Sequence, residues 1–135
     1  MPAISQNAVS TTTYNWVIRK GTNGGATWNT PVIIPTIGTQ SDCFLNGLDA
    51  DPAGNVYAVG RMYDILGHQR WIVAKGVNHG ASWALVDDYG PYAPLFAGRA
   101  TAVTCDAAGG VYVCGLAGLP GGTQGHWVVR KQVGP

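Results

Sequence analysis

The chain has 135 residues, a net charge of +1 and only 11% charged residues, well below the roughly 25% of an ordinary soluble domain. Its eight Lys and Arg residues are scattered, so no nucleic-acid partner is expected, and no apolar run approaches the roughly 20 residues of a membrane span. The N-terminus lacks the basic start and apolar stretch of a signal peptide. Localisation is left open between the cytoplasm and, for a piece of a longer secreted protein, the cell exterior or surface.

One sequence unit returns every 55 or 56 residues along the chain. The segment NWVIRKGTNGGATW from Asn15 matches RWIVAKGVNHGASW from Arg70 and HWVVRKQVGP from His126. A second segment, LDADPAGNVYAVG from Leu48, matches VTCDAAGGVYVCG from Val103. Several independent landmarks share one period, which is the sequence signature of a repeat fold.

The repeats divide the chain into a partial copy over residues 1–33, a full copy over 44–87 and a second partial copy over 99–131. The full copy contains four short strand-like runs separated by glycine-containing connections: 45–50, 55–60, 71–75 and 81–87. The third run begins with Trp-Ile-Val at Trp71, three apolar residues in succession. A strand with this pattern must be covered on both faces of its sheet.

Two kinds of tight turn recur in these copies. In the first kind, Asp51 and Asp106 are expected to accept backbone N–H groups, and Gly54 and Gly109 to adopt positive φ. In the second kind an asparagine takes the place of the aspartate, a glycine closes the turn and a tryptophan folds over it: Asn23, Gly25 and Trp28, then Asn78, Gly80 and Trp83.

The second turn resembles the Asp-box of sialidase-like propellers, Ser-x-Asp-x-Gly-x-Thr-Trp, with Gly21 and Gly76 replacing the Ser and Ser82 standing for one Thr. The Asp-x-x-Gly-Asn-Val-Tyr pattern from Asp51 resembles the repeats of bacterial seven-bladed propeller proteins. The resemblance implies an all-β chain of four-stranded antiparallel β-propeller blades, about two and a half per chain. In these families the Asp-box is a structural turn, so the resemblance implies architecture and no activity.

A propeller ring contains four to eight blades, so two and a half blades predict one of two situations. Either the chain is a homo-oligomer that completes the ring with copies of itself, as in small lectins built from two-blade chains, or it is a fragment of a larger propeller. Self-association is the favoured hypothesis. Open sheet faces then predict that Trp16, Val17, Trp127 and Val128 are exposed to water in the isolated chain.

The connections between the second and third strands and between successive copies vary, whereas the turns stay nearly constant. In a propeller both sets of variable loops lie around one mouth of the channel, where recognition residues are expected. Drift without function explains the same variation. The candidate binding residues on these loops are Arg61, Tyr63, Asp64, His68, Arg70, Tyr89, Tyr92 and Arg99.

The sequence predicts neither catalysis nor a cofactor. A sialidase-like site needs an arginine cluster and a Tyr–Glu pair, and the chain has no glutamate. Arg19 and Arg130 occupy equivalent repeat positions and are interpreted as repeat structure, while Asp87 and Asp88 are interpreted as a solvated pair. The histidines are too far apart in sequence to predict a metal site, and His79 is interpreted as a turn residue.

The chain has three cysteines, Cys43, Cys105 and Cys114. Their odd number and the lack of CxxC spacing argue against a disulfide framework or a zinc site, so they are interpreted as small buried apolar side chains. The five tryptophans recur in register, which favours core positions over sugar-binding platforms. The predicted function is a non-enzymatic propeller module, acting as a self-assembling scaffold or binding platform. The alternatives are a glycan-binding, lectin-like propeller and a fragment of a sialidase-like glycoside hydrolase, and the partners considered are the chain itself and a glycan or protein ligand.

Overall fold

The computed structural model describes residues 14–30, 32–34, 37, 43–89, 98–118 and 124–132. Within them the chain is all-β, with one short 3-10 turn, η1 (Asn23–Gly25), and no α-helix. The strands pair in antiparallel fashion and none of the sheets closes into a barrel. No helix in this part of the chain has the length and hydrophobicity that crossing a membrane would need.

The described strands fall into three groups along the chain. The first sheet is a hairpin made of two short pairs, β1 with β4 and β2 with β3: β1 (Trp16–Ile18), β2 (Gly21–Thr22), β3 (Thr27–Trp28) and β4 (Val32–Ile34). The central sheet has the order β5-β6-β7-β8: β5 (Phe44–Ala50), β6 (Val56–Tyr63), β7 (Gln69–Val77) and β8 (Ser82–Tyr89). The third sheet has the order β11-β10-β9: β9 (Arg99–Cys105), β10 (Val111–Gly118) and β11 (Gly125–Lys131).

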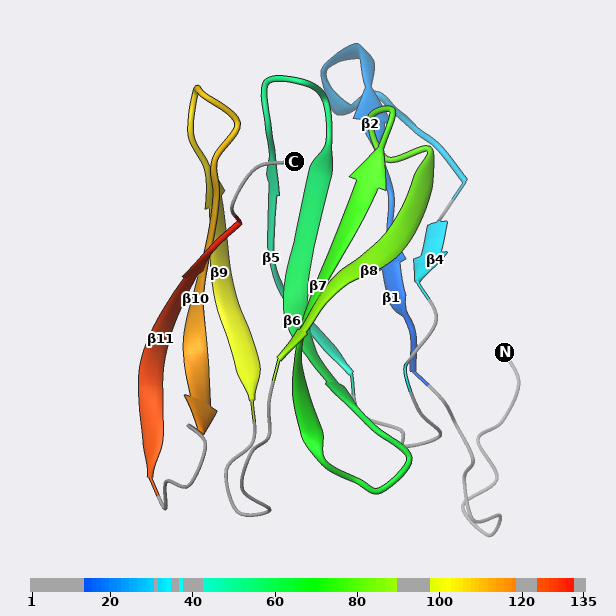
Figure 1. Cartoon of the computed structure of the whole chain (residues 1–135). Helices are drawn as coiled ribbons and strands as arrows, with labels where there is room; N and C mark the ends of the chain where they lie inside the picture. Colours follow the sequence, from blue (N-terminus) through cyan, green and yellow to red (C-terminus); the bar gives the residue numbers. More distant parts are fainter. Residues whose placement is uncertain are drawn as a thin grey trace, which may run out of the picture.

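The three sheets lie side by side as layers, with the central sheet between the other two (Figure 1). The described parts of the three sequence copies fall one in each sheet, and each strand-like run of the full copy forms one strand of the central sheet. The four-stranded antiparallel unit expected from the repeat is therefore confirmed for the full copy.

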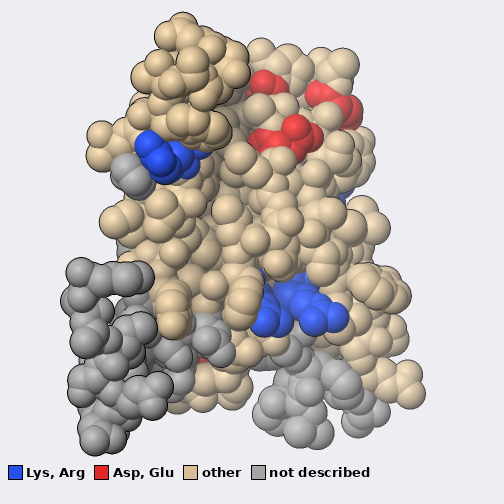
Figure 2. Space-filling view, turned by 180° about the vertical axis from the view of Figure 1, so that it is seen from behind, with Lys and Arg blue, Asp and Glu red and all other residues tan. Residues whose placement is uncertain are grey.

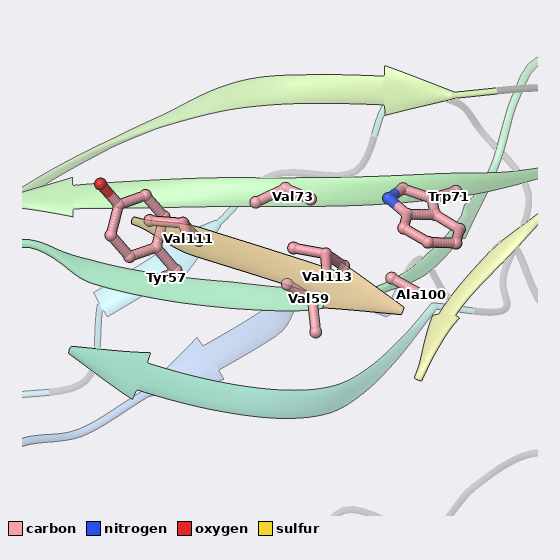
Figure 3. Packing of buried hydrophobic residues seen from close by; sticks show 7 residues of the cluster. All are labelled: Tyr57, Val59, Trp71, Val73, Ala100, Val111 and Val113. Carbon is pink, nitrogen blue, oxygen red and sulfur yellow. The ribbon is translucent and has the colours of Figure 1, made fainter. Parts of the chain in front are cut away.

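Both faces of the central sheet are covered. On one face Tyr57, Val59, Trp71 and Val73 pack against residues of the third sheet (Figure 3). On the other face, Ile72 and the side chains beside it pack against residues of the first sheet. The Trp-Ile-Val run of β7 thus points its side chains alternately into two different cores, and the prediction that this strand is covered on both faces is confirmed.

A tryptophan of one sheet packs over a glycine of the next sheet at each of the two boundaries. A Cβ built on Gly60 of β6 would lie 2.9 Å from the indole of Trp16, and a Cβ on Gly115 of β10 would lie 2.8 Å from the indole of Trp71. Trp16 and Trp71 are equivalent in the repeat and are only 2% and 0% exposed. Glycine leaves the recess that receives each indole, so the repeat places the same contact at both boundaries.

A β-bulge recurs beside each of these glycines. The register between β5 and β6 shifts between Leu45 and Gly47, and the register between β9 and β10 shifts between Cys114 and Gly115. The backbone oxygens of Phe44 and Arg99 lie directly over Gly60 and Gly115. A bulge bends the strand, and no side chain larger than hydrogen fits beneath the bend.

The outward faces differ in part from the prediction. Trp127 is 77% exposed and Val17 is 53% exposed, as expected, but Trp16 is buried and Val128 is half-buried. Successive residues of a strand point to opposite faces, so Trp16 faces the central sheet while Val17 faces away from it. In β11 the same alternation turns Val128 inward and leaves Trp127 outside.

The turns follow the predicted chemistry with one exception. Gly54 and Gly109 have φ of 83° and 88°, and Asp51 and Asp106 accept backbone N–H groups within their turns. In the second kind of turn Gly25 and Gly80 also have positive φ, and the indole of Trp83 donates to the carbonyl of Gly80 at 3.0 Å. The asparagines act through their backbone instead, since Asn23 and Asn78 have left-handed φ of 53° and 50°. His79 likewise has positive φ, at 59°, and its backbone N–H donates to the carbonyl of Gly54, so it is a turn residue as predicted.

Candidate functional site

The described candidate residues lie toward one end of the sheets, which we call the loop end (lower end in Figure 1). It carries the turn over residues 64–68, which joins β6 to β7. The Asp51 and Asp106 turns lie at the opposite end, which we call the Asp-turn end. Tyr92 lies outside the described residues.

Asp64 organises the turn at the loop end. One of its carboxylate oxygens accepts the backbone N–H groups of Leu66 and His68, both at 2.9 Å, and the other lies 3.3 Å from Nδ1 of His68. Partial burial raises the pKa of Asp64, but these hydrogen bonds and the nearby His68 outweigh it, so the pKa lies below its ordinary value. The carboxylate is therefore ionised at neutral pH and holds the turn closed.

Arg70 extends this cluster to the edge strand β8. Its guanidinium lies 3.6 Å from the carboxylate of Asp64 and donates through Nε to Asp88 at 2.9 Å. The interpretation of Asp87 and Asp88 as a merely solvated pair is wrong. Asp87 accepts two hydrogen bonds from Arg130 of the third sheet, at 2.8 and 2.9 Å, so each aspartate pairs with its own arginine.

Arg61 and Tyr63 lie at the same end of β6 but make different contacts. The guanidinium of Arg61 stacks 4.2 Å from the ring of Phe44. With the amide of Gln69 turned so that its oxygen faces Arg61, that oxygen accepts from two guanidinium nitrogens at 3.1 and 3.2 Å. Tyr63 is half-buried and lies opposite Gln69 in the β6–β7 register.

Tyr89 and Arg99 belong to the boundary between the central and third sheets. The ring of Tyr89 meets Trp71 edge to face at a centroid distance of 6.0 Å and lies 4.2 Å below the guanidinium of Arg130. Arg99 is half-buried, and no described residue forms a hydrogen bond with its buried Nε. The described candidate residues are therefore brought to one end, where Asp64, His68 and Arg70 form a connected cluster.

A pocket of about 490 Å³ lies at the Asp-turn end, between the central and third sheets, and the sequence reasoning missed it. Its lining includes one Asp and one Lys from each of the two copies, with Asp51 and Lys75 on one side and Asp106 and Lys131 on the other. The hydroxyl of Tyr57 lies 3.3 Å from the Asp51 carboxylate, and Lys75 lies 5.6 Å from its ring centroid. The recurrence of Asp, Tyr and Lys in the same order in both copies was the available signal.

Three aspartates, Asp49, Asp51 and Asp106, lie close enough to Cys105 of β9 for their charges to act on its thiol. Asp49 accepts the backbone N–H of Cys105 at 2.7 Å, which links the central sheet to the third. Burial, followed by the charges of Asp49, Asp51 and Asp106, raises the pKa of the Cys105 thiol to about 11. Figure 2 shows acidic side chains gathered at the Asp-turn end, one basic patch at a similar height on the other side of the view and a second basic patch nearer the loop end. All three cysteines are half-buried rather than fully buried.

The two turn aspartates make the folded state sensitive to acid. Backbone hydrogen bonding from Gly110 lowers the pKa of Asp106, and at Asp51 the hydrogen bonds from Asn55 and Tyr57 outweigh the raising effect of burial. A carboxyl whose folded pKa is depressed stabilises the fold above its ordinary pKa of about 4, and this contribution is lost as the pH falls through the folded pKa.

We therefore expect the urea midpoint of unfolding to be steady near neutral pH and to decline below about pH 4. The double variant Asp51→Asn, Asp106→Asn should show a shallower decline, since amides do not titrate. Urea titrations between pH 7 and pH 2.5 measure both curves. Equal slopes for the two proteins would show that these turns do not carry the acid sensitivity.

The described charged side chains take part in structural contacts. No group of three or more His, Cys, Asp or Glu residues within the described ranges could hold a metal ion. The ionised aspartates Asp51, Asp64 and Asp106 hold turns, and the carboxylates at the boundaries bind arginines or backbone N–H groups. Comparison with family models, with curated proteins and with solved structures finds no match for this chain.

Proposed function

We propose that this chain is a non-enzymatic β-propeller module that works as a self-assembling scaffold, with its sheets acting as blades. One observation carries the proposal. Trp16, Trp71 and Trp127 occupy the same place in the repeat, and the first two are 2% and 0% exposed while the third is 77% exposed. This repeat position is buried in two copies and exposed in the third, so a further blade would cover it in the third copy as well.

The energetic argument supports the same proposal. Covering an exposed tryptophan contributes on the order of 3 kcal/mol, at about 25 cal/mol per Å² of apolar surface. Val129, two residues further along β11 and on the same face, is 71% exposed and would be covered with it. Large apolar residues that share a face and are left to water are typical of an association surface.

The polar contacts support a scaffold rather than an enzyme. Arg130 binds Asp87 across the boundary of two sheets, and Asp49 binds the backbone of Cys105 across the same boundary. Asp64, His68 and Arg70 satisfy one another at the loop end. These charges fasten strands and sheets together, and the variable loop end is then the place at which such a scaffold would present a ligand site.

Light scattering coupled to size exclusion tests the proposal. At micromolar concentration we expect a particle of several times the chain mass of 14.1 kDa, and we expect Trp127→Ser to move it toward the single-chain mass. Ile65→Ser is the matched control, because Ile65 is 69% exposed but lies in the turn at the loop end, away from the bare face of β11. A wild-type chain that is folded and monomeric at these concentrations contradicts the proposal.

A further inference from the structure

We infer that the partner is a second copy of this chain, bound head to tail, with the bare face of β11 on the bare face of β1 and β4 of the next copy. The inference rests on the proposed function and specifies which two faces meet. It comes from the polarity of the two boundaries inside the chain, which are built alike.

Each internal boundary has two unlike sides. One side, the tryptophan face, carries the repeated tryptophan, which is Trp16 in the first sheet and Trp71 in the central sheet. The other side, the glycine face, carries the recess that receives it, at Gly60 in the central sheet and at Gly115 in the third. The chain therefore joins a tryptophan face to a glycine face at both boundaries, in the same order along the sequence.

The third sheet has an unused tryptophan face. Trp127 and Val129 lie on it, opposite Leu116 and Cys114 in the β10–β11 register. They are 77% and 71% exposed, whereas the equivalent Trp71 and Val73 of the central sheet are 0% and 4% exposed. This face is the apolar surface of β11 that no other described residue covers.

The first sheet has an unused face that corresponds to the receiving side of the central sheet. Val17 of β1 and Ile33 of β4 lie directly across from each other in register and are 53% and 60% exposed. Val17 is the equivalent of Ile72, which lies on the glycine face of the central sheet and is fully buried there. The bare face of the first sheet is therefore the side on which a tryptophan face is received.

One unused face of each kind on the same molecule favours a heterologous contact over a symmetric one. Two tryptophan faces brought together would oppose Trp127 to Trp127 of the other copy, a contact that neither internal boundary makes. The tryptophan face of one copy on the receiving face of the next instead continues the internal pattern. A heterologous contact of this kind generates a ring if the rotation between copies closes and an open filament if it does not.

Complementation between two single variants tests the direction of binding. Trp127→Ser removes the tryptophan face and leaves the receiving face, while Ile33→Asp does the opposite. Each variant alone should run as a monomer, since every head-to-tail contact needs both faces. A one-to-one mixture has a single intact pairing, so it should form a heterodimer of one copy of each and grow no further.

Native mass spectrometry with one variant labelled with ¹⁵N identifies the mixed dimer. Far-ultraviolet circular dichroism checks that both variants are folded, and Trp127→Phe, which keeps an aromatic ring, should retain assembly. Leu66→Ser is the matched control, because Leu66 is 74% exposed in the turn at the loop end, and it should assemble like the wild type.

The outcomes separate the inference from the proposed function. A mixed dimer supports head-to-tail binding. A wild type that assembles while the mixture stays monomeric, or a single variant that still assembles, overturns the head-to-tail geometry and leaves the scaffold proposal standing. A folded, monomeric wild type overturns both.

Discussion

Replacing Trp71 with alanine should lower the free energy of unfolding by about 3–5 kcal/mol. Trp71 is 0% exposed, packs over Gly115 of the third sheet and meets Tyr89 edge to face. The substitution leaves a cavity between two sheets, and their side chains cannot collapse into it without moving the sheets together. Because the whole free energy of unfolding of a domain is about 5–15 kcal/mol, a urea titration followed by circular dichroism should detect this loss clearly.

The repeat supplies the control for this experiment. Trp127→Ala makes the same chemical change at the equivalent position, where the side chain is 77% exposed. At submicromolar concentration, where association is minimised, it should change the free energy of unfolding by less than about 1 kcal/mol. Similar losses for both variants would mean that burial between sheets is not what stabilises the fold.

Replacing Gly60 with alanine is expected to cost about 3 kcal/mol or more, from crowding rather than from a cavity. The added methyl group would overlap the backbone oxygen of Phe44 and lie 2.9 Å from the indole of Trp16. The backbone oxygen belongs to the bulge of β5 and cannot rotate away as a side chain can. The measurement is again the urea midpoint, with the slope of the transition as a check that unfolding stays cooperative.

Gly21→Ala is the matched control for crowding. A Cβ at Gly21 would lie 3.4 Å from the indole of Trp28, an ordinary van der Waals contact, and Gly21 does not have positive φ. Its effect should stay within about 0.5 kcal/mol. If Gly60→Ala were equally mild, the recess between the first and central sheets would be wider than described here.

Much of the fold could be predicted because the same strand or turn had to fit equivalent positions in two copies of the repeat. The period of 55 residues located the strands, and the unbroken apolar run at Trp71 required cover on both faces, which the structure provides. The glycine turns followed from the need for positive φ at Gly54 and Gly109. Equivalent positions in two copies constrained each of these predictions, whereas a single copy leaves helix and strand harder to separate for short apolar runs.

The exposure of individual residues was harder to predict at the two outer sheets. Trp16 and Val128 were expected to be exposed to solvent, yet the side chains of both face the central sheet. The period-2 pattern fixes which residues share a face, but it does not by itself say which of the two faces meets the neighbour. That choice depends on how the sheets stack in space.

The site was predicted less well than the fold. The described candidate residues do lie at one end of the sheets. Their partners were not among the candidates: Asp88 binds Arg70, and Gln69 and Phe44 contact Arg61. These contacts join residues on neighbouring strands, and their partners follow from pairing register rather than from local spacing. The pocket between Asp51 and Asp106 depends on two sheets lying against each other, so it becomes visible only when their stacking is known.

The cover on both faces of the central sheet has a consequence for how the molecule comes apart. Each outer sheet packs against the central sheet through one face alone. Thermal fluctuations can therefore release one outer sheet while the central sheet stays packed against the other. Loss of order should therefore begin at β1 and β11 and reach β6 and β7 last, because arrays in which each unit touches only its neighbours fray from their ends.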